Sequence, residues 1–133
     1  MVRWARYAFA AIIWLFVVGV IVQTLYAGLG IFGTEGFEVH VTLGYTLHLV
    51  PVLVIAAAAL GRAGRTTLLW CLALIVSVGV QPFLPLLRDS MPLLAALHPV
   101  NALLIFGIAV VLAMRSLDLV RAAPGTRTPG ETA

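Results

Sequence analysis

The chain has 133 residues, of which 62% are hydrophobic and only 10% charged, and its mean hydropathy is +1.12. A soluble domain of this size has too little interior to bury so much apolar surface, so a soluble globular fold is excluded. The net charge is +3, and all of the basic residues are arginines. Because these arginines flank apolar segments, they describe membrane topology, and no nucleic-acid partner is expected.

Four apolar segments follow one another at about residues 4–27, 37–60, 67–87 and 92–115. Each is long enough to cross the ~30 Å hydrocarbon core of a lipid bilayer. We therefore predict an all-α membrane protein with four transmembrane helices in one domain, residues 1–121. The first segment is longer than the apolar core of a signal peptide and lacks a small-x-small cleavage site, so we expect a retained helix.

The connections between the helices carry turn-forming residues. Four glycines mark residues 28–36 as a turn, and Gly61 is placed to cap the second helix before a short basic loop. Short connections make consecutive helices antiparallel neighbours, which predicts an up-down-up-down bundle with the second and fourth helices diagonally opposed. The stretch 122–133 is polar and rich in proline and glycine, so we predict a disordered cytoplasmic tail.

The arginines indicate the orientation of this bundle. Only Arg88 lies on one side of the predicted membrane, and the others lie on the opposite side: Arg3, Arg6, Arg62, Arg65, Arg115, Arg121 and Arg127. Arginine is enriched in short cytoplasmic flanks. The sequence therefore predicts a multi-pass protein of the cell membrane with both termini cytoplasmic.

Each predicted helix carries one polar residue at a similar depth below its outward end: Gln23, His40, Gln81 and His98. At ~1.5 Å per residue, all four lie within one band roughly 5–9 Å below the outer boundary. Ionisable residues inside a membrane are functional candidates, and the neutral imidazole readily binds metals. This coincidence of depth predicts a site in which His40 and His98 are the metal ligands.

Residues beside the two histidines favour such a site. Gly44 follows His40 on the same helix face and would let a flat macrocycle, or another helix, approach closely. Pro99 predicts a kink that turns His98 inward. Asn101, one turn on, is placed to bond a neighbour of the imidazole, a propionate or another helix.

A third histidine, His48, does not share this depth. It follows His40 by eight residues, which places it ~12 Å deeper and ~80° around the helix. We expect a packed histidine bonded to a nearby carbonyl or hydroxyl group such as Thr24 or Ser77, with a proton relay or a quinone contact as the alternative.

The ligand set favours haem over zinc. A closed zinc site needs four protein ligands, whereas a porphyrin supplies four nitrogens and needs only two axial ligands from the protein. The single cysteine, Cys71, excludes covalent haem attachment through C-x-x-C-H and is expected to be a packing residue. We therefore predict one haem b between His40 and His98, with Gln23, Gly44, Gln81 and Asn101 around it.

Two segments resemble a known family. Phe37-Glu38-Val39-His40-Val41-Thr42-Leu43-Gly44 and Leu97-His98-Pro99-Val100-Asn101-Ala102-Leu103-Leu104-Ile105-Phe106 are similar to the starts of helices two and four in one half of haem A synthase. That resemblance implies a four-helix bundle in which a histidine on each of these helices binds haem b. The chain is also similar to a group of small actinobacterial membrane proteins.

The chain departs from haem A synthase in two respects. Haem A synthases have eight helices, and they carry a glutamate about one turn before the first histidine, where this chain has Gly36 and Phe37. The resemblance therefore implies haem binding rather than synthase activity.

Three functions follow as hypotheses. The first is a small b-type cytochrome for electron transfer, with quinone or a redox partner protein as its partner. The second is a non-catalytic accessory or scaffold subunit of a homo- or hetero-oligomer, in which the histidines are structural. The third is a small-molecule binder or transporter, although the predicted helices lack the acidic residues expected for ion coupling.

We predict that a reporter fused to the C-terminus will behave as cytoplasmic, because seven arginines flank the ends of the helices on that side. The measurement is the activity of paired reporters that are active on only one side of the membrane. A signal from the outer side would reverse the predicted orientation and place the histidines near the cytoplasmic face.

Overall fold

The computed structural model describes residues 1–34 and 36–122. Its helical elements are α1 (Val2–Ile31), α2 (Glu38–Leu47), α3 (Val50–Leu60), α4 (Gly64–Val80), the 3₁₀ helix η1 (Pro85–Leu87), α5 (Pro92–Ala95) and α6 (Leu97–Arg121). They form four spans that are long and apolar enough to cross a membrane: Val2–Ile31, Glu38–Leu60, Gly64–Leu87 and Pro92–Arg121. The prediction of an all-α membrane protein with four transmembrane helices is confirmed. The predicted tail lies outside the described residues, except for Ala122.

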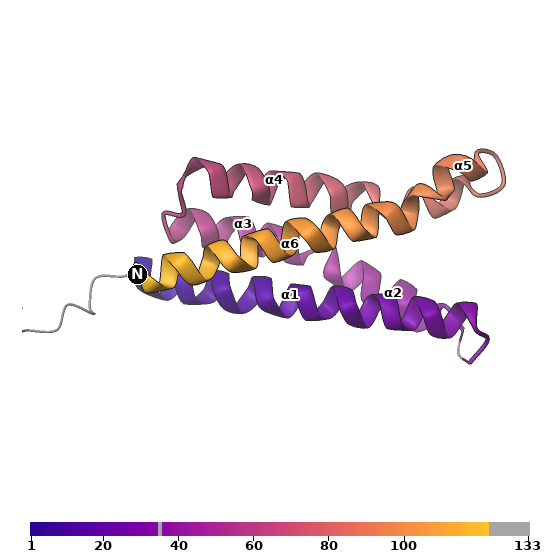
Figure 1. Ribbon diagram of the computed structural model, residues 1–133, viewed down its shortest axis with the longest axis horizontal. Helices are drawn as coiled ribbons and strands as arrows, with labels where there is room; N and C mark the ends of the chain where they lie inside the picture. The colour runs from indigo at the N-terminus through magenta and orange to yellow at the C-terminus, as the bar shows by residue number, and fades with distance from the viewer. Residues whose placement is uncertain (35, 123–133) are drawn as a thin grey trace, which may run out of the picture.

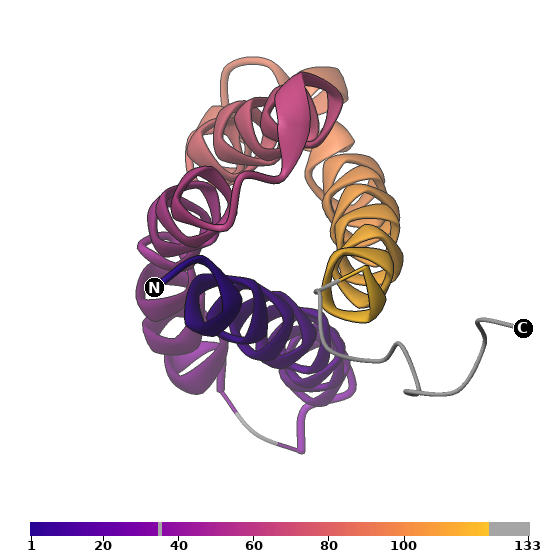
Figure 2. The same cartoon turned by 90° about the vertical axis from the view of Figure 1, so that its left-hand side faces the viewer.

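The four spans run side by side along the long axis of the molecule (Figure 1). Both α1 and α4 pack against α3 and α6, so α3 and α6 are on opposite sides of the bundle. Figure 2, which views the bundle along its axis, shows this closed arrangement. The predicted diagonal placement of the second and fourth spans is therefore confirmed.

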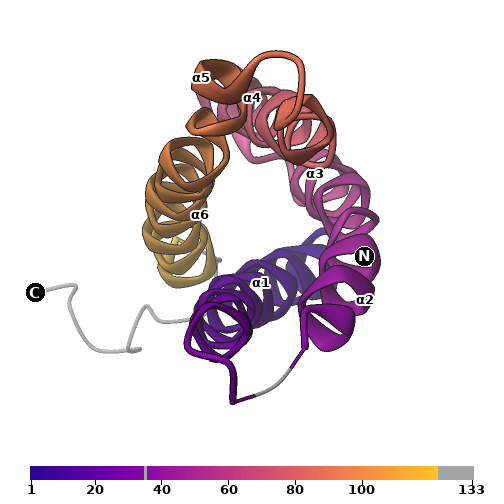
Figure 3. The ribbon, with the colours of Figure 1, turned by 90° about the vertical axis from the view of Figure 1, so that its right-hand side faces the viewer.

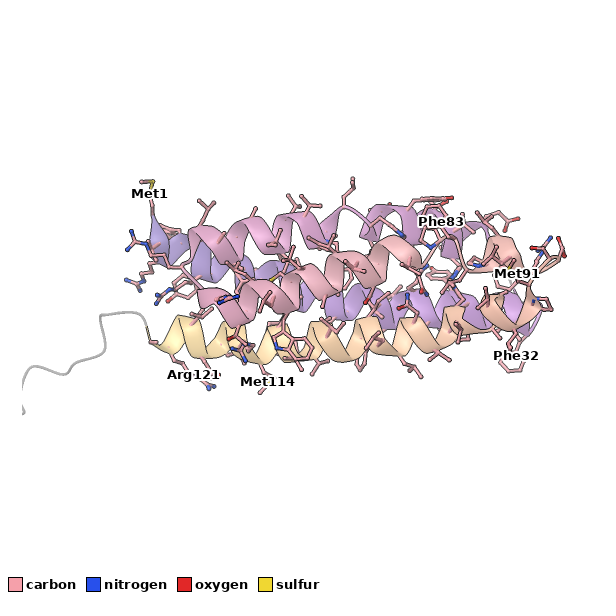
Figure 4. The ribbon with its side chains drawn as sticks, turned by 90° about the horizontal axis from the view of Figure 1, so that it is seen from above. Met1, Phe32, Phe83, Met91, Met114 and Arg121 are labelled. Atoms are coloured by element: carbon pink, nitrogen blue, oxygen red, sulfur yellow. The ribbon has the colours of Figure 1, made fainter. Side chains whose placement is uncertain are left out.

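The two ends of the bundle are easily distinguished. Met1 and Arg121 lie at one end, here called the arginine end, and Phe32 and Met91 lie at the other, here called the histidine end (Figure 4). The apolar core lies mainly in the half toward the arginine end, where Phe9, Ile13, Leu74 and Leu112 are fully buried. Within the described chain, α2, η1 and α5, which form the histidine end, contribute no buried side chain.

The first and last helices are longer than predicted. The helix α1 continues to Ile31, so Gly28 and Gly30, which we expected in a turn, are helical. The ring of Phe37 covers Gly30 so closely that a Cβ there would lie 2.8 Å from Phe37 Cε1. The chain turns only at Gly33, whose φ of +70° favours glycine. The helix α6 likewise continues past the predicted end, residue 115, to Arg121.

Prolines interrupt three of the spans, as their ring sterics require. The second span breaks at His48 and Leu49, shortly before Pro51. The third leaves α-helical geometry after Val80 and continues through turns to η1. The fourth breaks at Ala96, between α5 and α6, three residues before Pro99. These breaks release main-chain carbonyl groups inside an apolar bundle, where each needs a new donor.

One arginine ties three spans together at the arginine end. Arg6 of α1 donates from Nε to the carbonyl of Gly61 (3.0 Å) and from Nη1 to the carbonyl of Leu119 (3.1 Å). Both carbonyls belong to helix C-termini, which lack intrahelical donors and attract positive charge. A Cβ at Gly61 would lie 3.2 Å from Arg6 Cγ, so the glycine also makes room for this side chain.

We predict that Arg6→Leu will lower the free energy of unfolding by about 1–3 kcal/mol, because two partly buried carbonyl groups lose their donor. The matched control is Arg3→Leu, since Arg3 is exposed and contacts only the ring of Tyr7 among the described aromatic residues. Its effect should stay within about 0.5 kcal/mol. The measurement is reversible unfolding in detergent micelles. Equal losses in the two variants would contradict the proposed role of Arg6.

Candidate functional site

A cavity of about 510 Å³ lies between α1, α2, α4 and α6, toward the histidine end. This volume is within the range of pockets that bind cofactors and drug-sized ligands. Figure 3 views this end of the bundle, with α2 and α6 on opposite sides. The lining is mostly apolar: Phe16, Val20, Ile21, Ala27, Leu47, Val78, Pro99, Ala102, Leu103, Ile105 and Phe106, together with Thr24 and Gly44. Its remaining lining residues are Gln23, His40, His48, Gln81 and His98.

On one side of the cavity, Gln23 of α1 and His40 of α2 form two reciprocal hydrogen bonds. Gln23 Nε2 donates to the carbonyl of His40 (2.7 Å), and His40 Nδ1 lies 3.1 Å from the carbonyl of Gln23. A carbonyl oxygen only accepts, so Nδ1 carries the proton in this bond. The pair joins the end of α1 to the start of α2 and holds the imidazole in one orientation.

Gln81, at the end of α4, and His98 of α6 repeat this arrangement. Gln81 Nε2 donates to the carbonyl of His98 (3.0 Å), and His98 Nδ1 lies 3.1 Å from the carbonyl of Gln81. This second carbonyl is available because Pro85, four residues on, has no N–H to donate to it. The glutamine and histidine of both pairs are separated by 17 residues. The bundle thus contains the same two-helix unit twice.

Asn101 supports the second pair. Its Nδ2 donates to Gln81 Oε1 (2.6 Å) and to the carbonyl of Ser77 (2.8 Å). The Ser77 carbonyl is free because the N–H of Gln81 bonds Val78 in the tightened last turn of α4. Of the roles considered from the sequence, the structure gives Asn101 interhelical hydrogen bonding.

The two histidines meet across the cavity. Their ring centroids are 6.2 Å apart, with an angle of 69° between the ring planes. Both Nδ1 atoms bond main-chain carbonyls, so in the neutral rings both Nε2 atoms carry the lone pair. No other described residue hydrogen-bonds either Nε2 atom. Imidazoles that bind metals have this arrangement, in which the second ring nitrogen donates to a carbonyl and fixes the tautomer.

His40 and His98 are the residues that would hold a metal here, since their rings are neighbours and each has a lone pair on Nε2. The described residues contain no group of three or more His, Cys, Asp or Glu side chains placed to hold a metal ion. The donor set of two histidines therefore fits haem, whose porphyrin supplies the other four ligands, and does not fit a closed zinc site.

The His48 ring bonds a nearby carbonyl, as expected, but its partner and its surroundings differ from the prediction. Its Nδ1 lies 2.6 Å from the carbonyl of Gly44 in its own helix, and neither Thr24 nor Ser77 is its partner. It also lines the same cavity as His40 and His98, although its helical position predicted a different face. His48 still has helical backbone angles, and its N–H bonds the Gly44 carbonyl (3.2 Å), so its position on the helix is regular. The cavity is wide enough to be lined by both His40 and His48.

The predicted polar layer is thus assembled in space. Gln23, His40, Gln81 and His98 are brought together, Gly44 lines the cavity, and Asn101 lies behind Gln81. Sequence reasoning missed the reciprocal bonds and the inclusion of His48. The equal spacing of Gln23 to His40 and of Gln81 to His98 is the signal that could have indicated a repeated unit.

Comparison with known proteins gives one similarity. Residues 23–87 match the model of a family of unknown function, DUF6220. The matched range contains Gln23, His40 and Gln81 and ends before His98. No curated protein and no solved structure matches the chain. The resemblance to haem A synthase therefore stays a prediction.

We predict that Gly44→Ala will release His40 from its glutamine. A Cβ at this position would lie 2.8 Å from Gln23 Nε2, so the amide must move away from the His40 carbonyl. The control is Gly79→Ala, where a Cβ meets no described atom within 4 Å and should stabilise the helix by roughly 0.5–1 kcal/mol.

The Gly44→Ala variant should be less stable than the control by about 1–2 kcal/mol, because the helix gain is offset by a lost hydrogen bond. Nitrogen-15 NMR of the His40 ring should report the same change. Identical stabilities, with an unchanged His40 signal, would show that the glutamine amide does not depend on Gly44.

Proposed function

We propose that this protein is a small membrane cytochrome that binds one haem b between His40 and His98 for electron transfer. The observation that carries the proposal is the pair of neighbouring imidazoles, whose ring centroids are 6.2 Å apart, with Nδ1 of each bonded to a carbonyl. This leaves Nε2 of each ring as the atom that would bind iron. The resemblance to the haem-binding half of haem A synthase supports the same conclusion.

The surrounding residues each have a role in such a site. Gln23 and Gln81 orient the two rings through reciprocal bonds, and Asn101 holds Gln81 in place. The absence of a side chain at Gly44 leaves room for the Gln23 amide. Most of the cavity lining is apolar, which suits a largely apolar macrocycle.

A bound haem b would supply a one-electron ferric/ferrous couple, whose potential depends on the axial ligands, their hydrogen bonds and the burial of the site. One haem near one end of the bundle cannot by itself carry electrons across ~30 Å of membrane. The proposed function therefore includes a partner, either a quinone dissolved in the bilayer or a redox protein. With the arginines cytoplasmic, this site faces the outer side of the cell membrane.

A structural role is the second candidate, and the reciprocal bonds favour it directly. Each pair joins two consecutive spans, α1 to α2 and α4 to α6, and satisfies main-chain carbonyls that lie in an apolar setting. In that case the protein is an accessory or scaffold subunit. The two candidates differ in one measurable property, which is the presence of a Soret band in the purified protein.

We predict that His40→Ala or His98→Ala will abolish the low-spin haem spectrum or leave a five-coordinate, high-spin form, because one axial ligand is lost. The control is His48→Ala, which should keep the low-spin spectrum, since the His48 ring bonds within its own helix. The measurement is the reduced-minus-oxidised optical spectrum, with electron paramagnetic resonance for the spin state.

The bundle itself should survive these substitutions, because its core is concentrated toward the arginine end. A wild-type protein without a Soret band, when expressed with ample haem, would overturn the cytochrome proposal in favour of the scaffold. A loss of the low-spin form in His48→Ala but not in His40→Ala would reassign the axial pair.

A further inference from the structure

The cavity reaches the outer surface of the bundle on the side of α1 and α6. Four of its lining residues are exposed, namely Ile21 and Thr24 of α1 and Pro99 and Leu103 of α6. The exposed fraction is 54% for Ile21 and 73% for Leu103. The lining residues that lie in α2 and α4, or directly after them, are all buried or half-buried. Since α1 and α6 are neighbours, the cavity opens between the first and last spans.

These four exposed residues, here called the rim, surround an apolar opening. Ile21 and Thr24 are three residues apart, and Pro99 and Leu103 are four apart, so each pair lies on one helix face. The Thr24 hydroxyl donates to the carbonyl of Val20 (2.9 Å). The rim therefore has no side-chain donor that requires water. None of the described residues that line the cavity is an acid or an arginine.

The rim lies at the depth of the hydrocarbon core. Thr24 and Ile21 precede the end of α1, at Ile31, by ~10 and ~15 Å. The 30 residues of α1 span ~45 Å, so a centred helix extends beyond the ~30 Å core by only ~7 Å at each end. Both rim residues of α1 then lie in hydrocarbon. The molecules that meet the opening are therefore the acyl chains of the leaflet at the histidine end.

We propose that the cavity takes its occupant sideways from the bilayer, and that without a cofactor it holds one hydrocarbon chain of a membrane lipid. The chain enters between α1 and α6 and lies against the inner wall that Gly44, Leu47 and Val78 form on the opposite side. It exchanges one apolar environment for another, and its atoms give the lining the dispersion contacts that an empty volume lacks. The lipid headgroup stays at the interface of the histidine end.

Water is the competing occupant. A buried water molecule requires two to four polar partners. The donors of Gln23, His40, Gln81 and His98 already bond main-chain carbonyls. A cavity of about 510 Å³ that is mostly apolar and opens into hydrocarbon is filled more favourably by a chain than by water. The proposal rests on the rim and the lining, and it does not depend on haem.

The test uses the full-length protein, prepared without added haem, in nanodiscs of a phosphatidylcholine that carries a diazirine in the middle of one acyl chain. Light expels nitrogen from the diazirine and leaves a carbene, which forms a covalent bond with the residue that it touches. Mass spectrometry then identifies the labelled residues. We expect adducts on Val78, which is only 5% exposed and lines the cavity.

The matched control residue is Leu74, one turn earlier on the same face of α4. It is fully buried in the core and lies outside the cavity lining, so it should carry no adduct. If Val78 carries no more adduct than Leu74, the chain does not enter. The proposal is then overturned, and water is left as the occupant.

A bulky side chain inside the cavity should exclude the lipid chain. Ala102→Trp fills the cavity from α6, because Ala102 lines it. Its control is Leu104→Trp, at an exposed position of the same helix that lies outside the lining. The Val78 adducts should be lost in the first variant and kept in the second, while Leu74 stays unlabelled in both if the core is intact. Equal labelling of Val78 in the two variants would overturn the proposal.

Haem and the chain require the same volume, so a bound haem should displace the chain. The Soret band decides the haem proposal, and the Val78 adducts of the haem-free protein decide this one. A protein without a Soret band whose Val78 is labelled keeps the chain site and loses the cytochrome. A protein with a Soret band whose Val78 is unlabelled when haem-free does the reverse.

Discussion

The structure depends on the need to satisfy main-chain carbonyl groups where helices break inside an apolar bundle. In hydrocarbon there is no water to bond them, so each released carbonyl needs a protein donor. Pro85 frees the carbonyl of Gln81, and the ring of His98 donates to it. The tightened end of α4 frees the carbonyl of Ser77, and Asn101 donates to it. His98 and Asn101 are therefore also the residues that allow α4 to end there.

The packed core and the candidate site lie in different halves of the bundle. The half toward the arginine end holds the buried core, and Arg6 joins α1 to the ends of α3 and α6. The half toward the histidine end holds the cavity, with polar side chains in place of a packed interior. Because the two halves are distinct, the packed half can hold the spans in register while the other keeps an open volume. A cavity that must admit a ligand gains little from the close packing that stabilises a core.

The glutamine–histidine unit occurs twice, but the two units differ in the hydrogen bonding of the glutamine oxygen. In the second unit, Asn101 bonds the glutamine oxygen, and the amide is fully engaged. In the first, the corresponding oxygen is buried without a donor among the described residues, and so is His48 Nε2.

The architecture could be predicted from the sequence because span length and hydropathy report directly on the thickness of a bilayer. The four spans, the diagonal relation of the second and fourth, and the shared depth of Gln23, His40, Gln81 and His98 all follow from helical rise and short connections. Helical rise and the length of the connections can be read directly from the order of residues along the chain. Helix ends were predicted less well, because Gly28 and Gly30 are helical and Phe37 packs over Gly30.

Only the tertiary structure decided which atoms of the polar side chains form hydrogen bonds, and with which partners. The sequence by itself placed His40 and His98 at one level, but it did not show that their Nδ1 atoms bond the glutamine carbonyls. It also placed His48 on another helix face, and it did not show that one wide cavity is lined by both His40 and His48. Hydrogen-bond partners and local helix breaks depend on contacts between distant segments. For that reason they became visible only when the four spans were brought together.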